Sequence, residues 1–491
     1  MSLSLEFNKI QTNLSIPLSA SSGIECKLPL SEEEGKEICH ITTKVSLISV
    51  DCYNHEIKYN GKAIFNVLYK KDGALKKCET GVEFSYKFEN ENVLEGMNVL
   101  AEVIAENVKI NILNGIVSLS AVVVFKGEIT KDVNLEYFSN EPNLILKHED
   151  VYYSTIVDKV KREFKIEDEY DVPILVEDVL SHNEKVYITN CQCAIGCVIV
   201  DGEIEATTLF KSLQEDKDIE CNVRKIPFRV EIENKDVGID NQTCVLAKVK
   251  NSNLKVYVDE GKNKSVISIE VCIETSAKIY TNYNLNIIND AYSLDCDIKL
   301  NKENTKICQF LDIDCIEENV KEEINFKNVE NSRLICVLSD KIESVNYKIV
   351  DGELCVSGLA NITCLFKGEN LQVESVNVPF TFKKQTSGNA YSTINSEISD
   401  VNITKTNVEF TIKTWYTAVN EKNCCVITLV EEGNKKQLND SAISVYIPEK
   451  GDCLWDICKK LNAKEEEILS MNDNLEFPLT GEERLVVFRE K

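Results

Sequence analysis

Three cysteines lie close together near the middle of the chain, at Cys191, Cys193 and Cys197. Thiolates are common zinc ligands, and His182 could supply a fourth ligand. The spacing, Cys-x-Cys-x-x-x-Cys, departs from the Cys-x-x-Cys knuckle that is typical of structural zinc sites. In a strand, Cys191 and Cys193 would instead share one face and pack as small apolar side chains. We expect this packing role and no metal.

Side chains suited to catalysis are also sparse. His40, His55, His148 and His182 stand in unrelated contexts, and no Gly-x-Ser-x-Gly or His-Glu-x-x-His motif occurs. Gly196 lacks the further glycines of a phosphate-binding loop, so we expect no ATP site and no cofactor. Acidic runs such as those in this chain are typical of solvated faces. The sequence therefore predicts a protein that is not an enzyme.

The charge balance argues against nucleic acid as a partner. The 491 residues include 55 basic and 81 acidic side chains, which gives a net charge of -26. A phosphate backbone would be repelled by such a chain. No stretch approaches the roughly 20 apolar residues that span a bilayer, and residues 1–25 lack the basic region and apolar run of an export signal. We expect no membrane span and a protein that stays where it is made.

The 20 cysteines fit this expectation, because in a long chain without an export signal they are expected to stay reduced and to pack as small hydrophobic side chains. The neighbours Cys424 and Cys425 cannot easily bond to each other and should point to opposite faces of a strand. Later cross-linking of such thiols is a hypothesis that non-reducing gels would test.

The positions that would hold any site belong mostly to strands. Apolar and polar residues alternate in many short runs, such as 117–125 and 267–273. A period of two predicts strands with one buried face. Charged breaks at 259–264 and 366–370 interrupt these runs as hairpin turns would. Because each half-apolar sheet must cover another, the expected fold class is mainly β, with β-sandwich-like domains.

Three segments of this β-rich body repeat in the same order. In the first, a glycine is followed eight residues later by the aromatic residue of a Leu-aromatic pair, from Gly61 to Tyr69, Gly202 to Phe210 and Gly358 to Phe366. The likeness continues through residues 82–90, 226–234 and 378–386, and then through 100–110, 246–256 and 394–405. The glycines recur after 141 and then 156 residues, which predicts a tandem of folded domains.

These repeated positions are structural rather than chemical. Each glycine indicates a tight turn or a close backbone approach, and the Leu-aromatic pair puts one large side chain on each sheet face. A chain of this length exceeds a single core. The expected domains are 1–150 with an N-terminal extension, 151–300, 301–440 and a small α+β domain at 441–491.

A tight helical rhythm begins only near the C-terminus, in residues 446–474. A short strand should precede it, after which Gly451 turns the chain and Asp452 caps a helix. The apolar face of that helix consists of Leu454, Ile457, Cys458 and Leu461.

The remainder of this region completes a compact βααβ order. A second helix over residues 464–471 should bury Ile468 and Leu469. A last strand is expected over 484–488, after a turn at Thr480 and Gly481.

Residues 443–489 resemble a LysM domain. The family pattern runs Tyr-x-Val-x-x-Gly-Asp-Thr-Leu-Trp-x-Ile-Ala, then Leu-x-x-x-Asn, then a Pro-x-x-Gly turn. The chain matches it in order at Tyr446, Gly451, Asp452, Leu454, Trp455, Ile457, Ile468, Leu469, Asn472, Pro478 and Gly481. Cys453 and Cys458 replace the usual Thr and Ala. The resemblance implies binding of N-acetylglucosamine polymers through loops at 451–454 and 471–476, although Cys453 removes a hydroxyl from that site.

Three repeats ahead of one LysM domain resemble the SipL-like family of spore coat morphogenetic proteins, which carry tandem SPOCS domains. The SPOCS motif includes a Gly-led strand that ends in Leu-Tyr or Leu-Phe and is followed by a Pro-Phe element. The chain has Leu209-Phe210 with Pro227-Phe228, and Leu365-Phe366 with Pro379-Phe380. Its first repeat has Leu68-Tyr69 but Glu83-Phe84 in place of Pro-Phe.

This resemblance implies a non-enzymatic adaptor located in the mother cell cytoplasm, at the forespore surface and in the spore coat. It would bind the coat ATPase SpoIVA through the LysM domain, and other coat proteins are further candidate partners. The candidate partner-binding residues are Asp452, Leu454, Trp455, Ile457, Met471 and Asn472. Trp455 and Ile457 are equally suited to be core positions of a 50-residue domain, and both interpretations stay open.

Two other functions remain open from the sequence. The LysM domain would bind peptidoglycan glycan of the spore envelope in the first, and the chain would assemble into a coat lattice in the second.

Overall fold

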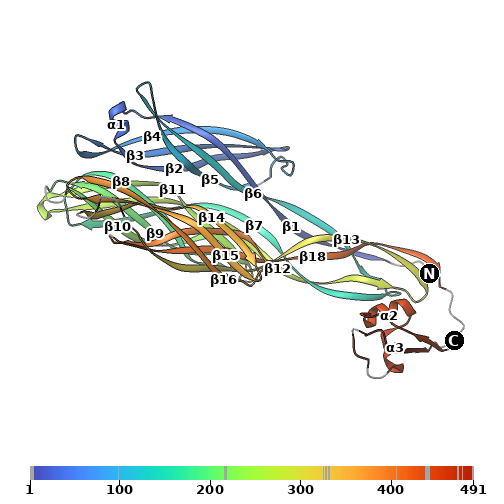
Figure 1. Cartoon of the computed structure of the whole chain (residues 1–491). Helices are drawn as coiled ribbons and strands as arrows, with labels where there is room; N and C mark the ends of the chain where they lie inside the picture. The colour runs from blue at the N-terminus through green and yellow to red at the C-terminus, as the bar shows by residue number, and fades with distance from the viewer. Residues whose placement is uncertain are drawn as a thin grey trace.

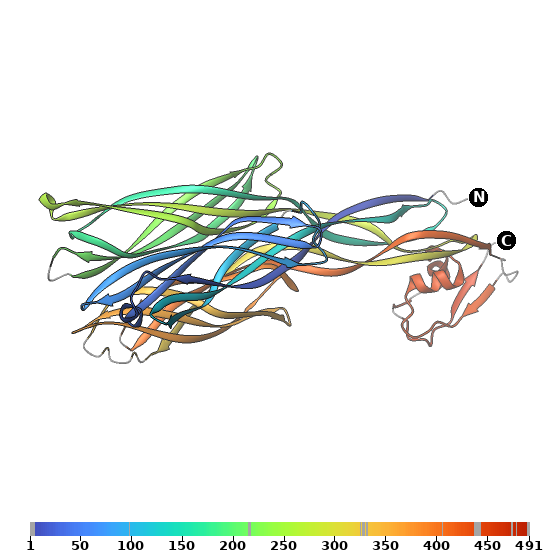
Figure 2. The same ribbon diagram turned by 90° about the horizontal axis from the view of Figure 1, so that it is seen from above.

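Antiparallel strands dominate the protein, which confirms the mainly β fold class. The computed structural model describes residues 5–488 except 98, 215–217, 325, 327–328, 330–331, 405, 437–442, 473–474 and 478. Elongated units lie side by side, and a small helical module lies beyond one end of them (Figures 1 and 2). No helix in the described ranges is both long and apolar enough to cross a bilayer.

The first two units have the same order of strands. Unit 1 consists of β1 (Glu6–Lys27), α1 (Glu32–Lys36), β2 (Ile38–Tyr53), β3 (Glu56–Lys71), β4 (Ala74–Glu89), β5 (Val99–Leu113) and β6 (Ile116–Asn140). Unit 2 consists of β7 (Ile145–Val172), β8 (Val176–Ala194), β9 (Cys197–Ser212), β10 (Ile219–Glu233), β11 (Gln242–Asp259), the 3₁₀ turn η2 (Glu260–Lys262) and β12 (Lys264–Tyr292).

A third unit repeats that order before the module begins. Unit 3 consists of β13 (Cys296–Glu323), β14 (Arg333–Val350), β15 (Glu353–Lys367), β16 (Leu371–Gln385), β17 (Ala390–Ile403) and β18 (Asn407–Lys435). The C-terminal module consists of β19 (Ile443–Tyr446), α2 (Leu454–Leu461), α3 (Glu465–Met471) and β20 (Leu485–Phe488).

Each unit is a sandwich of two three-stranded antiparallel sheets. In unit 1 the strand orders are β1-β6-β5 and β2-β3-β4, and units 2 and 3 repeat them as β7-β12-β11 with β8-β9-β10, and β13-β18-β17 with β14-β15-β16. The burial pattern explains why the sheets pair. Side chains along β9, the central strand of the second sheet of unit 2, alternate between buried and partly exposed, so one face of the sheet is covered by the other sheet. Each sandwich encloses its own apolar core.

The repeated glycines lie inside strands and not at turns. Gly61, Gly202 and Gly358 stand directly across the ladder from Phe84, Phe228 and Phe380, the phenylalanines of the second repeated segment. A Cβ built on Gly202 would lie 2.4 Å from Cζ of Phe228 and 2.5 Å from the carbonyl oxygen of Tyr187. The close backbone approach that the sequence suggested is therefore real, and the aromatic ring fills the space that a side chain would need.

Gly202→Ala should lower the free energy of unfolding by about 1 to 3 kcal/mol, because the new methyl group overpacks the space held by Phe228. Urea unfolding followed by circular dichroism measures the change. Gly23→Ala in β1 is the matched control, since a Cβ there meets nothing within 4 Å. Equal midpoints for the two variants would contradict this explanation of the repeat.

The three units close into a ring. Strand β4 of unit 1 contacts β8 of unit 2, β10 contacts β14 of unit 3, and β16 contacts β2 of unit 1. These are equivalent strand pairs, so each unit uses one surface toward the next unit and another toward the previous one, as in a cyclic trimer. Leu68, Leu209 and Leu365, the leucines of the Leu-aromatic pairs, meet in one buried cluster at this junction.

The long first and last strands of the units extend past the sandwiches as two-stranded arms. The paired segments are 6–13 with 132–140, 145–155 with 281–292, and 296–309 with 420–435. Figure 1 shows them projecting together toward the module, and we call them the stalk. Buried side chains from all three arms pack in its interior, among them Tyr137, Ile287 and Val426. The ring and the stalk therefore form one continuous body.

A buried ion cluster lies in the region where the units meet. Glu128 of β6 accepts hydrogen bonds from the Nζ atoms of Lys159, at 3.0 Å, and Lys278, at 2.6 Å. Nζ of Lys278 also donates to Oγ1 of Thr393 at 3.1 Å. One carboxylate thus links β6 of unit 1 to β7 and β12 of unit 2, and through Lys278 to β17 of unit 3.

Candidate functional site

The first helix of the module begins one residue later than the sequence suggested. Cys453 is the N-cap of α2, and its backbone N–H donates to Oδ2 of Asp456 at 3.2 Å. The Asp452 carboxylate is engaged elsewhere, since it accepts from the backbone N–H of Glu449 at 2.9 Å and from Nζ of Lys460 at 3.0 Å. The expectation that Asp452 caps the helix was therefore wrong. Asp452 instead ties the loop before α2 to the last turn of that helix.

The core of the module confirms one expected apolar face and corrects another. Ile457 is fully buried against Leu479 and Leu485. Ile468 of α3 is also fully buried, but the neighbouring Leu469 is 45% exposed. Consecutive residues of a helix point about 100° apart, so Ile468 faces the core of the module while Leu469 turns toward solvent. The predicted burial of Leu469 was wrong.

Asn472 joins the end of α3 to strand β20. Its Nδ2 donates to the carbonyl oxygens of Ile468 and Val486, both at 2.8 Å. Its Oδ1 accepts from the backbone N–H of Val486 at 2.7 Å. The side chain thereby satisfies backbone groups that a two-stranded sheet leaves unpaired. Met471, beside it, is partly exposed, and Pro478 of the LysM pattern lies outside the described residues.

Trp455 points out of the module and into the stalk. Its ring packs edge-on against Tyr292 of β12, with centroids 5.1 Å apart, and its Nε1 donates to Oδ2 of Asp290 at 2.9 Å. Leu454 packs in the same apolar cluster, together with Ile145 and Leu294 of the stalk side. Trp455, a candidate partner-binding residue, is therefore in contact with the protein's own stalk, and Leu454 packs against the same cluster.

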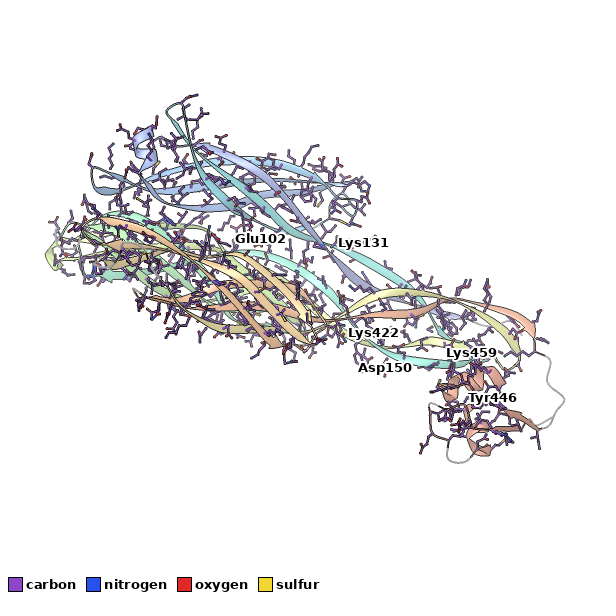
Figure 3. The ribbon with its side chains drawn as sticks, viewed as in Figure 1. Glu102, Lys131, Asp150, Lys422, Tyr446 and Lys459 are labelled. Atoms are coloured by element: carbon purple, nitrogen blue, oxygen red, sulfur yellow. The ribbon has the colours of Figure 1, made fainter. Side chains whose placement is uncertain are left out.

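Polar contacts hold the same junction from both sides. Nζ of Lys459 lies 2.8 Å from Oδ2 of Asp290, and Figure 3 labels Lys459 where the module meets the stalk. Tyr292 donates its hydroxyl to the carbonyl oxygen of Ala463 at 2.7 Å, and Asn462 donates Nδ2 to the carbonyl oxygen of Leu294 at 2.6 Å. Burial raises the pKa of Asp290, but the bonds from Lys459 and Trp455 outweigh it and hold that pKa below its ordinary value. These contacts fix the position of the module against the stalk.

Asp290→Ala should weaken the contact between the module and the stalk and expose Trp455. The expected result is a red shift of Trp455 fluorescence, because the indole loses its acceptor and gains water contact. The measurement uses a Trp415→Phe background, which leaves Trp455 as the sole tryptophan. Lys302→Ala is the control, since Lys302 contacts Asp290 at 3.2 Å without touching Trp455. An unshifted spectrum for Asp290→Ala would contradict the docked arrangement.

The side of the module sheet that faces away from its helices is apolar and exposed. Val445 of β19 stands directly across from Val486 of β20, and Ile443 lies two residues before Val445 on the same face. The exposed fractions are 62% for Ile443, 61% for Val445 and 39% for Val486. We call these three residues the outer face. Their inward-facing neighbours Leu485 and Val487 are buried, as the alternation of a strand requires.

The cysteine group that could have bound zinc packs inside unit 2. Cys191 and Cys193 lie against the core of that unit, and burial raises the pKa of each thiol, to about 12 and about 11. His182 contacts Glu184 through Nδ1, at 2.5 Å from Oε1. Within the described part of the chain, no three His, Cys, Asp or Glu side chains are grouped to hold a metal ion.

These features define a class of protein: three fused β-sandwiches in a ring, with a stalk that carries a small βααβ module. Residues 36–113 and 175–257 match the family model for the SipL, SPOCS domain. The matches span β2 to β5 of unit 1 and β8 to β11 of unit 2, which are equivalent parts of the two units. They support a SipL-like, spore-related protein. No curated protein and no solved structure matches the chain.

Proposed function

We propose that the protein is a non-enzymatic adaptor of spore coat assembly, which binds a SpoIVA-like coat ATPase through its C-terminal module. It would act in the mother cell cytoplasm and help to place the coat basement layer around the forespore. We also propose that the three units are SPOCS domains and that residues 441–491 form a LysM domain. The observation that carries the proposal is the SPOCS family match in units 1 and 2 of a chain that holds a separate module at the tip of a stalk.

The candidate partner-binding residues differ in how far they are exposed to a partner. Ile457 is buried, Trp455 contacts the stalk, and Leu454 packs against the cluster that Trp455 and Tyr292 share. The three aliphatic side chains of the outer face are 62%, 61% and 39% exposed in the described chain, and adjacent exposed aliphatic side chains are the kind of surface that a protein partner covers. We therefore propose that the outer face makes the direct contact with the partner. Asp452, Ile457 and Asn472 would keep the module folded, and Trp455 would hold the module against the stalk.

A capture experiment with the full-length chain tests this function. The immobilised protein is offered a purified SpoIVA-like ATPase and, separately, insoluble peptidoglycan. We expect ATPase capture by the wild type, loss of capture by the double variant Val445→Ser, Val486→Ser, and capture by the control Ile48→Ser. Ile48 is a 64% exposed aliphatic residue of unit 1. Its substitution removes the same kind of side chain as the double variant does, but at a surface outside the module.

The outcomes separate the adaptor from its main alternative. A protein that retains peptidoglycan but no ATPase would be a glycan-binding protein of the spore envelope, and the adaptor proposal would be abandoned. Capture of the ATPase by the double variant as well as by the wild type would remove the outer face from the proposal.

A further inference from the structure

The interface between units 2 and 3 brings two thiols together. Sγ of Cys221, in β10, lies 2.9 Å from Sγ of Cys336, in β14. None of the 20 cysteines is bonded in a disulfide in this structure. A disulfide needs a sulfur separation of about 2.05 Å, so the pair would have to close by less than 1 Å. Two strands of different units thus present thiols within reach of one bond.

The position of the pair in the ring gives such a bond a structural effect. Cys221 stands across the ladder from Leu209, and Cys336 stands across from Leu365, two of the leucines that meet at the junction of the units. A bond between them would therefore fasten unit 2 to unit 3 beside the centre of the ring.

At the equivalent position between units 1 and 2, the two units are joined by polar contacts and not by a pair of thiols. Lys77 stands across from Leu68 in β4, as Cys221 stands across from Leu209 in β10. Its Nζ donates to Oδ1 of Asp178 at 3.0 Å and to the carbonyl oxygen of Val179. The thiol pair therefore occupies a position that joins neighbouring units elsewhere in the same ring.

A small oxidant can reach the pair. Both cysteines line a cleft of about 330 Å³ between units 2 and 3, whose wall also includes Lys225, Val337 and Asp400. Cys221 is partly exposed there, and Cys336 is buried. Contact with Cys221, together with burial, raises the pKa of Cys336 well above its ordinary value. Cys221 is thus the thiol that meets the oxidant first.

We propose that Cys221 and Cys336 form a redox-controlled disulfide that locks unit 2 to unit 3 when the protein meets a peroxide. The Cys221 thiolate attacks hydrogen peroxide, which gives a sulfenic acid and releases hydroxide. That hydroxide removes the proton of Cys336, whose thiolate attacks the sulfenic sulfur; the S–S bond forms, and the sulfenic oxygen leaves as hydroxide, which takes up the proton that Cys221 released and becomes water. Two thiols are oxidised by two electrons while the peroxide is reduced to two waters. In a reducing cell interior the pair stays as thiols, and the ring is held by noncovalent contacts between the units.

Peptide mapping of the full-length protein tests the bond. After treatment with hydrogen peroxide and alkylation of free thiols, trypsin should release residues 218–224 joined to residues 334–341. Each of these peptides contains a single cysteine, so the joined species identifies the pair. Its mass should be lower by two hydrogens than the sum of the two peptides, and reduction should separate them. The midpoint of thermal unfolding should rise by several degrees on oxidation, since the bond closes a long loop.

Variants provide the controls. Cys221→Ser and Cys336→Ser should each abolish the joined peptide and the thermal shift, whereas Cys272→Ser, a partly exposed cysteine of β12, should leave both unchanged. If Cys336→Ser fails to fold, the map of the wild-type protein decides alone. Recovery of both peptides as alkylated free thiols after oxidation, or of Cys221 joined to a different cysteine, would overturn the proposal.

Discussion

Ile457→Ala is expected to unfold the C-terminal module while units 1 to 3 stay folded. Ile457 has no exposed surface and packs against Leu479 and Leu485. Removing three carbons from such a site costs about 3 to 5 kcal/mol, through lost burial and the cavity left behind. A module of this size has a total stability of only a few kcal/mol, so the loss consumes most of it.

Helical signal and partner capture together measure this effect. The helices among the described residues that exceed five residues are α2 and α3, so the far-ultraviolet helical signal reports mainly on the module. We expect that signal to melt at a lower temperature and capture of the partner to disappear. Leu469→Ala, at a position of α3 that is 45% exposed and lies outside the outer face, is the control; it should change stability by less than about 1 kcal/mol and leave capture intact. An Ile457→Ala variant that melts like the wild type would show that Ile457 does not support the module.

Acid should weaken the interface between units 1 and 2 through Glu184. The Glu184 carboxylate of β8 is fully buried and lies 2.9 Å from Nζ of Lys44 in β2 of the neighbouring unit. It also accepts from Oγ of Ser252 at 2.5 Å. Burial raises its pKa, but the hydrogen bond from His182 and the charge of Lys44 outweigh burial and hold the pKa at about 2. The carboxylate is therefore more acidic in the folded protein than its ordinary value of 4.5.

The direction of the pH effect follows from this difference. A carboxyl group whose pKa is lowered by folding stabilises the folded state fully above its unfolded pKa, near 4.5, and loses that contribution as the pH falls toward 2. At about 1.4 kcal/mol for each pKa unit, the contribution at neutral pH is about 3 kcal/mol. Glu184→Gln should thus destabilise the protein at pH 7 and flatten the fall in stability between pH 4.5 and pH 2.

Urea unfolding at a series of pH values measures that profile. Glu56→Gln serves as the control, because Glu56 pairs with Lys87 on the surface at 2.8 Å and exposed pairs contribute less than about 1 kcal/mol. If Glu184→Gln and Glu56→Gln gave the same profile, the buried pair would not be the source of acid sensitivity.

Local sequence patterns were sufficient for the type of the long strands and of the two helices of the module, but not for the short helix α1. Alternation along residues 117–125 and 267–273, in β6 and β12, predicted the mainly β class, and the helical spacing of Leu454, Ile457, Cys458 and Leu461 placed the first helix of the module. These features depend on which faces of an element are apolar, and that is written in the order of residues along a short segment. The cap at Cys453 and the exposure of Leu469 were missed, because each depends on which neighbour competes for a bond or a buried position.

The repeat could be recognised in the sequence, but the structural role of the repeated residues could not be predicted from it. Aligning Gly202 with Gly61 and Gly358 revealed equivalent positions, yet only the strand register places Phe228 across from Gly202. The repeated leucines likewise looked like ordinary core residues of separate domains. The structure brings them to one junction, because the edge strands of neighbouring units contact one another around the ring.

The sequence by itself determined the strands and the helical tail, which follow from periodicity within a short stretch, and the three repeats, which follow from segments that recur in the same order after 141 and 156 residues. Tertiary structure alone decided that the units close into a ring, that Trp455 meets Asp290 and that Cys221 meets Cys336. Those last two pairs are 165 and 115 residues apart along the chain. Contacts of that kind arise when whole sandwiches pack against each other, and no local pattern of residue types encodes the angle at which they do so.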